Sequence, residues 1–86
     1  MSNQLKSRLD RIETRSDLSE FVSALQRDFE KNKEEWENPS IDCFLEAMSA
    51  WIEDMDGYYK NQGQNFSEEQ PWKMFAEILL ASKVYE

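Results

Sequence analysis

Carboxylates are the side chains of this sequence whose types and spacing come closest to a chemical site. Glu53, Asp54 and Asp56 occur within four positions, and on a helix the first and last of them would share one face. Two carboxylates at this spacing could hold a hard cation such as Mg²⁺ or Ca²⁺. The D-x-D-x-D-G pattern and distal Glu of a calcium loop are absent. Carboxylate metal binding is therefore a second alternative, and the expectation is a solvated helix face with no metal and no cofactor.

Other catalytic groups are scarce. The sequence has no histidine, which removes the commonest general base and the Ser-His and Cys-His nucleophile pairs. Cys43 is the only cysteine, so neither a thiolate zinc site nor an internal disulfide can form. Gly57 and Gly63 are the only glycines, and neither precedes the Lys-Ser/Thr of a phosphate-binding loop. We expect no enzyme activity and no catalytic residue.

The same carboxylates predict a binding surface. At about 100° per residue, four acidic positions between 42 and 56 fall on one arc of a helix. Such an arc would attract a basic partner protein. Association would be fast, and binding would weaken as salt is added. An immunity protein for a basic toxin, or a nucleic-acid mimic, would use a surface of this kind. The first hypothesis is a non-catalytic acidic protein-interaction module that binds a basic partner.

Two aromatic residues could add apolar contacts to this surface. Trp36 stands in the charged connection KNKEEWEN, where a tryptophan could anchor a partner. Tyr58 lies beside an Asn/Gln-rich loop, and such neighbours form adaptable binding patches. The alternative is that the aromatic residues share a core. The predicted partner-binding residues are Trp36, Asp42, Glu46, Glu53, Asp56 and Tyr58.

The net charge of −8 is unevenly distributed. Residues 1–33 contain seven Lys/Arg and six Asp/Glu, whereas residues 34–86 contain three and twelve. An acidic surface repels nucleic-acid phosphates and anionic lipids, so we expect neither a nucleic acid nor a membrane as partner. The N-terminus has no apolar signal-peptide run, and no segment approaches the roughly 18 apolar residues of a membrane span. The expected location is the cytoplasm.

Helices are expected to position these residues. Two Gly and two Pro are few for an all-β chain, and no window shows the alternation of a half-buried strand. Residues 16–31 place apolar side chains at helical spacing. Asp17 and Glu20 resemble a capping arrangement, which predicts a helix that begins at Ser16 or Asp17 and ends near Lys31.

A second predicted helix carries the acidic arc. Asn38 is a good N-cap and Pro39 suits the first helical position. Apolar side chains then form one stripe as far as Tyr59. Gly57 is expected to weaken the last turn by about 1 kcal/mol, and Gly63 is expected to end the helix.

The last predicted helix opens at Pro71 and is apolar over most of its circumference as far as Tyr85. A helix of this kind lies in the centre of a core or is covered by a partner. Pairing of residues 71–85 from two copies would bury the surplus apolar surface. A homo-oligomeric structural domain, dimeric through the C-terminal helix, is therefore the first alternative function.

These segments together predict an all-α chain. Residues 16–86 are expected to form one small bundle of three core helices. Residues 1–15 are expected to form an arm or a short N-terminal helix, because Leu5, Leu9 and Ile12 fall at helical spacing.

Two long stretches also carry a family likeness. The stretch WENPSIDCFLEAMSAWIEDMDGYYKNQGQ (36–64) and the stretch PWKMFAEILLASKVYE (71–86) resemble a family of small acidic bacterial domains of unknown function. The likeness extends over about residues 17–86. It implies a stand-alone, all-helical domain and brings no enzyme activity. The comparison with immunity proteins rests on size and charge alone.

Overall fold

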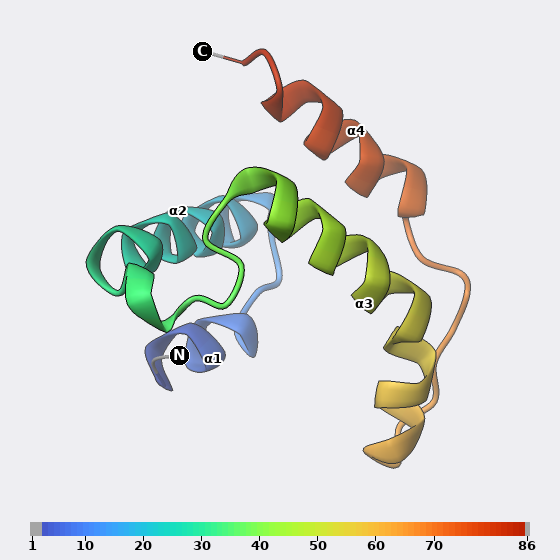
Figure 1. Ribbon diagram of the computed structural model, residues 1–86. Helices are drawn as coiled ribbons and strands as arrows, with labels where there is room; N and C mark the ends of the chain where they lie inside the picture. Colours follow the sequence, from blue (N-terminus) through green and yellow to red (C-terminus); the bar gives the residue numbers. More distant parts are fainter. Residues whose placement is uncertain (1–2, 86) are drawn as a thin grey trace. The chain divides into compact units, whose positions relative to one another are not determined.

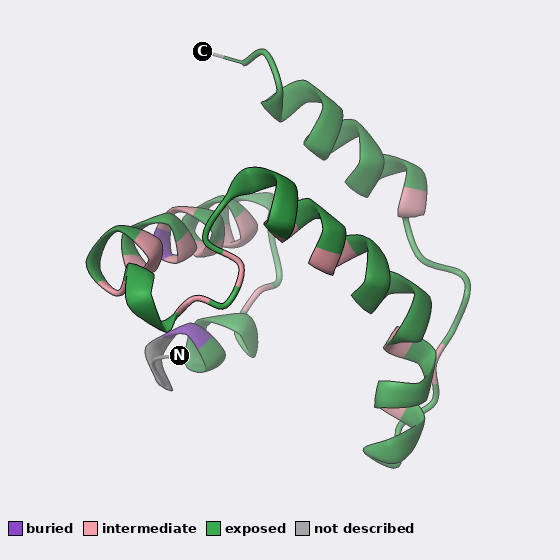
Figure 2. Ribbon diagram, in the orientation of Figure 1, coloured by how far each residue is buried: buried purple, intermediate pink, exposed green. Residues whose placement is uncertain are grey.

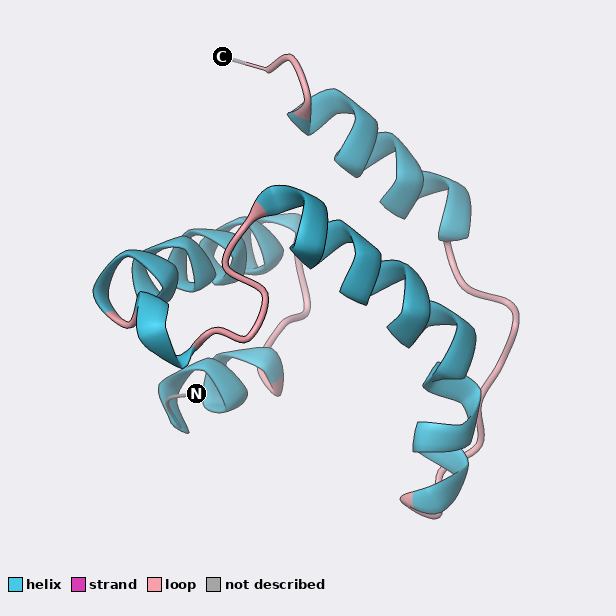
Figure 3. Ribbon diagram, in the orientation of Figure 1, coloured by secondary structure: helices cyan, strands magenta, loops and turns pink. Residues whose placement is uncertain are grey.

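A computed structural model describes the backbone of residues 3–85 and the side chains of residues 5–85. The described residues are helical and contain no strand, which confirms the all-α prediction (Figures 1 and 3). The chain divides into two compact units, Met1–Trp51 and Ile52–Glu86. The helical elements are α1 (Asn3–Leu9), α2 (Arg15–Lys31), the short 3₁₀ helix η1 (Lys33–Glu35), α3 (Ile41–Asn61) and α4 (Trp72–Ser82).

Helix α2 begins with a capping box. The hydroxyl of Thr14 accepts a hydrogen bond from the backbone N–H of Asp17 at 3.0 Å. In return, the carboxylate of Asp17 accepts from the backbone N–H groups of Glu13 and Thr14. The prediction that Asp17 and Glu20 form the cap was wrong, because Asp17 is the third residue of a box that starts at Thr14. The helix accordingly begins at Arg15.

The first unit buries apolar side chains where α1 packs against α2. Leu5 of α1 is only 4% exposed, and Ala24 of α2 is also buried (Figure 2). Of the two alternatives for residues 1–15, the described part therefore forms the short helix.

Helix α3 begins later than predicted. The backbone N–H of Phe44 donates to the carbonyl of Ser40 at 2.8 Å, which makes Ser40, rather than Asn38, the residue before the first turn. Serine is favoured as a cap as well as asparagine, and Ser40 was not among the predicted starts. Pro39 therefore precedes the helix and does not open it.

The end of α3 agrees with the prediction. Gly63 has a φ of +75°, which suits glycine because it lacks a Cβ. Its N–H donates to the carbonyl of Lys60, and the N–H of Gln64 donates to that of Tyr59. This pair of hydrogen bonds is a Schellman motif. Gly57 remains inside the helix.

The second unit is organised by aromatic neighbours along the chain. Ring centroids lie 5.9 Å apart for Tyr59 and Phe66, 6.2 Å for Phe66 and Trp72, and 6.4 Å for Trp72 and Phe75. The indole N–H of Trp72 donates to the carbonyl of Glu68 at 2.7 Å. Pro71 immediately precedes α4 and accepts from the N–H of Phe75, close to the predicted start.

Candidate functional site

The predicted acidic residues all lie exposed on α3. Asp42 and Glu46 belong to the first unit, and Glu53 and Asp56 belong to the second. Within the first unit, Asp42 and Glu46 are four residues apart, and within the second unit, Glu53 and Asp56 are three residues apart, so the two carboxylates of each pair share a helix face. Lys60 is the single basic residue of α3. Each unit therefore carries a pair of exposed, neighbouring carboxylates on its part of α3.

The position of Asp42 at the start of α3 lowers the pKa of its carboxyl group. The hydroxyl of Ser40 lowers the pKa of its carboxyl group, and the backbone N–H groups of Cys43 and Asp42 lower the pKa further. Hydrogen bonds to a carboxylate favour its charged form. The N-terminal end of the helix dipole also favours the negative charge of Asp42.

Trp36 lies half-buried between two phenylalanine rings. Its ring centroid is 5.1 Å from that of Phe29 on α2 in an edge-on arrangement, and 6.0 Å from that of Phe44 on α3 in a stacked one. Its indole N–H donates to the carboxylate of Asp28 at 2.8 Å. These contacts give Trp36 a place in the packing of the first unit. The role of Trp36 as an anchor for a partner stays a prediction.

An apolar groove of about 420 Å³ opens beside Trp36. Val22, Leu25 and Phe29 of α2 line one side of it, at the i, i+3 and i+7 positions of a helix face. The other side comes from the segment between residues 36 and 44, which includes Ile41 and Phe44. Val22 and Ile41 are both more than half exposed. The helical periodicity of Val22, Leu25 and Phe29 was visible in the sequence, but their opposite wall was not.

The segment that forms the second side of the groove is rich in carboxylates. The segment from residue 34 to residue 42 contributes four exposed acidic side chains. One lysine, Lys33, is placed with its ammonium 5.3 Å from the ring centroid of Phe29. The segment thus combines an apolar groove with an excess of negative charge. The four acidic residues are Glu34, Glu35, Glu37 and Asp42.

Tyr58 lies in the second unit, near the end of α3. Its ring meets that of Tyr59 edge-on, with centroids 5.2 Å apart. About half of Tyr58 is exposed, whereas Tyr59 is half-buried and stacks on Phe66. The ring of Tyr58 therefore contacts that of Tyr59, which in turn stacks on Phe66.

Glu53, Asp54 and Asp56 are the carboxylates that could hold a hard cation. Across the described residues, no group of three or more His, Cys, Asp or Glu side chains is arranged to hold a metal ion. Within the same part of the chain, no helix has the length and hydropathy needed to cross a membrane.

Residues 14–86 match the family of unknown function DUF7660, and the chain belongs to this family. The match begins at the N-cap of α2 and includes α3 and α4. Helix α1 therefore precedes the matched region. No curated protein and no solved structure matches the chain significantly.

Proposed function

We propose that this member of DUF7660 is a non-catalytic interaction domain that binds a basic partner protein. The observation that carries the proposal is the exposure on α3 of all four carboxylates of the predicted arc, Asp42, Glu46, Glu53 and Asp56. Lysine and arginine side chains of a partner would meet this arc. Long-range attraction between opposite charges raises the rate of association and makes binding weaker as salt is added.

The apolar groove supports a partner that carries more than charge. Protein interfaces combine an apolar centre with a polar, charged rim. In the first unit, the groove beside Trp36 would supply the apolar centre, and the acidic side chains from residue 34 to residue 42 would supply the rim. The partner surface that fits is an apolar side chain flanked by basic residues.

Neutralisation of a basic toxin by an immunity protein is one role for such a domain. The immunity role is supported by the acidic charge and the small size of the chain. A bacterial, cytoplasmic origin belongs to the same proposal.

The test compares two variants of equal net charge. The tagged chain is used to capture proteins from the lysate of its native cell at low and at moderate salt, and the captured proteins are identified by mass spectrometry. In one variant, Glu53→Lys and Asp56→Lys reverse charges on the arc. In the control, Glu68→Lys and Glu69→Lys make the same change in net charge outside α3.

The proposal expects a captured protein of basic composition that is released as salt rises. The α3 variant should lose this protein, and the control variant should keep it. Equal capture by the wild type and the α3 variant would contradict the proposed surface. Equal loss from both variants would show that net charge alone, rather than the arc, attracts the protein.

Helix α4 favours a second candidate function, a homodimer. Its apolar side chains are largely exposed, including Ile78, Leu79 and Leu80. Pairing of α4 from two copies would remove this apolar area from water. Light scattering over a range of concentrations tests this candidate. A dimer should have the mass of two chains, and this mass should fall on dilution. The substitution Leu79→Glu should also lower it. A mass of one chain at every concentration would exclude it.

A further inference from the structure

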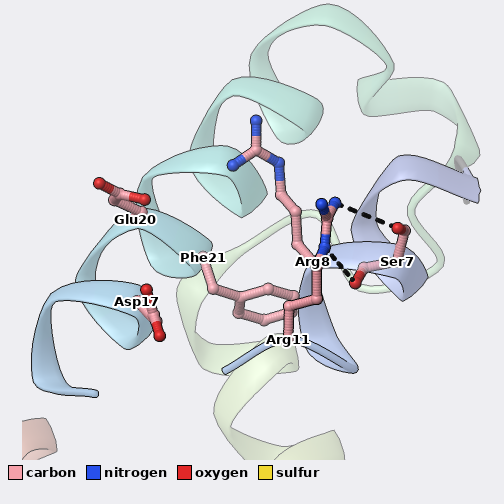
Figure 4. A pocket seen from close by; sticks show the side chains of 6 residues that line it. All are labelled: Ser7, Arg8, Arg11, Asp17, Glu20 and Phe21. Carbon is pink, nitrogen blue, oxygen red and sulfur yellow. Dashed lines mark hydrogen bonds between the residues drawn. The ribbon is translucent and has the colours of Figure 1, made fainter. Parts of the chain in front are cut away.

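A second cavity lies within the first unit, between α1 and α2. Its volume is about 540 Å³, within the usual range for small-molecule sites. The packing of buried Leu5 against α2 holds the two walls together. The lining residues are Ser7, Arg8, Arg11, Asp17, Glu20 and Phe21 (Figure 4).

The charges of this cavity are balanced and separated. Figure 4 shows Asp17 and Glu20 on the side of α2, and the two arginines on the side of α1 and the turn that follows it. The half-buried ring of Phe21 lies between the two sides. A cavity with two positive and two negative groups on opposite sides favours a ligand that is itself bipolar.

Hydrogen bonds already orient one charged group on each side. The guanidinium of Arg11 donates to the carbonyl of Ser7 at 3.3 Å and to its hydroxyl at 3.1 Å. Arginine has five N–H donors, so further donors remain for a ligand. Asp17 is engaged in the capping box of α2. Arg8 and Glu20 are exposed to solvent and complete the two poles.

We propose that this cavity binds a free amino acid with an apolar side chain. Arg8 and Arg11 would receive its carboxylate, because guanidinium groups match the planar geometry of carboxylates. The carboxylate of Glu20 would receive the ammonium group. Phe21 would contact the side chain, which favours an aromatic amino acid.

The site is independent of the acidic arc on α3. One of its walls, with Ser7, Arg8 and Arg11, precedes the region matched by the family, residues 14–86. Amino-acid binding is therefore a property of this chain that the rest of the family does not need to share.

Calorimetric titration of the full chain at low salt tests the proposal with three related probes. L-phenylalanine carries both charges, 3-phenylpropanoate lacks the ammonium group, and 2-phenylethylamine lacks the carboxylate. Only L-phenylalanine satisfies both poles, so its affinity should exceed that of either comparator by about tenfold or more, as expected for the loss of a charge-assisted hydrogen bond. Equal affinities, or no binding of L-phenylalanine, would overturn the proposal.

Matched variants connect the binding to the two poles. Arg8→Gln and Glu20→Gln should each weaken L-phenylalanine about tenfold. The controls Arg27→Gln and Glu30→Gln make the same chemical changes at exposed positions of α2 outside the cavity, and they should leave the affinity unchanged. Circular dichroism confirms that each variant is folded. Unchanged affinity in folded Arg8→Gln and Glu20→Gln would place the ligand elsewhere.

Discussion

The two units contain tryptophans in closely similar surroundings. Trp36 lies between Phe29 and Phe44, and Trp72 lies between Phe66 and Phe75. The indole N–H of each is hydrogen bonded. The difference is in the reach of these contacts along the chain.

Trp36 connects α2 with α3, whereas Trp72 stabilises the start of α4. The partner of the Trp36 indole is the carboxylate of Asp28, eight residues earlier on helix α2. The partner of the Trp72 indole is a backbone carbonyl four residues earlier, in the loop that enters α4. The same aromatic arrangement therefore has a tertiary role in the first unit and a local role in the second.

The largest expected effect separates these two roles. Trp36→Ala should lower the free energy of unfolding by about 3 kcal/mol, the lower end for removal of a large core aromatic, because the side chain is half-buried. Trp72→Ala should cost about 1 kcal/mol, since it breaks mainly local contacts. Urea denaturation followed by circular dichroism measures both. Equal losses would contradict the distinction, and Trp36→Phe should recover part of the stability.

A second prediction concerns the buried contact of the first unit. Leu5→Ala should cost about 2 kcal/mol, because Leu5 is 4% exposed and its truncation leaves a cavity. Leu9→Ala is the matched control on the same helix, since Leu9 is 56% exposed and should change stability by about 0.5 kcal/mol at most. Thermal unfolding of the two variants provides the measurement. Equal midpoints would mean that α1 does not pack on α2 in solution.

The glycines of the second unit predict effects of opposite sign. Gly63→Ala should cost about 1 kcal/mol, because a Cβ is strained at a φ of +75°. Gly57→Ala should stabilise α3 by about 0.5–1 kcal/mol, since a Cβ there meets nothing within 4 Å and alanine favours the helix. Denaturant midpoints measured side by side test this pair. Destabilisation by Gly57→Ala would show that α3 does not continue through this position.

The smallest expected effect is a pH dependence in the first unit. The backbone N–H of Glu13 is the main cause of the lowered pKa of Asp17, with additional hydrogen bonds from Thr14. A carboxyl with a lower pKa in the folded state stabilises the fold above its unfolded value of about 3.9 and loses this contribution as pH falls through the folded value. Asp17→Asn retains an oxygen acceptor but cannot titrate, so its stability should fall less steeply than that of the wild type below about pH 4.

Asp10→Asn is the control for this titration, because Asp10 is exposed and lies outside the capping box. A wild-type slope retained in Asp17→Asn would assign the pH dependence to another carboxyl group.

Local sequence patterns were sufficient to predict the helices and the charge of α3. Apolar periodicity depends on neighbours within one helix, so it predicted the segments around α2, α3 and α4 without knowledge of their partners. The end of α3 at Gly63 was also predictable, because the required φ suits glycine. The arc of carboxylates follows from spacing on a single helix in the same way. The start of α3 was not predictable, since Asn38 and Ser40 are both favoured caps.

Which surfaces face one another depends on contacts between segments, and these became visible only in the folded chain. Trp36 stands among charged residues in the sequence, yet its ring meets two phenylalanines from α2 and α3. The apolar groove and the bipolar cavity each have walls from separate segments. Leu5 and Leu9 have the same side chain on the same helix, and only the position of α2 makes one buried and the other exposed. Contacts between segments depend on packing, which local spacing does not encode.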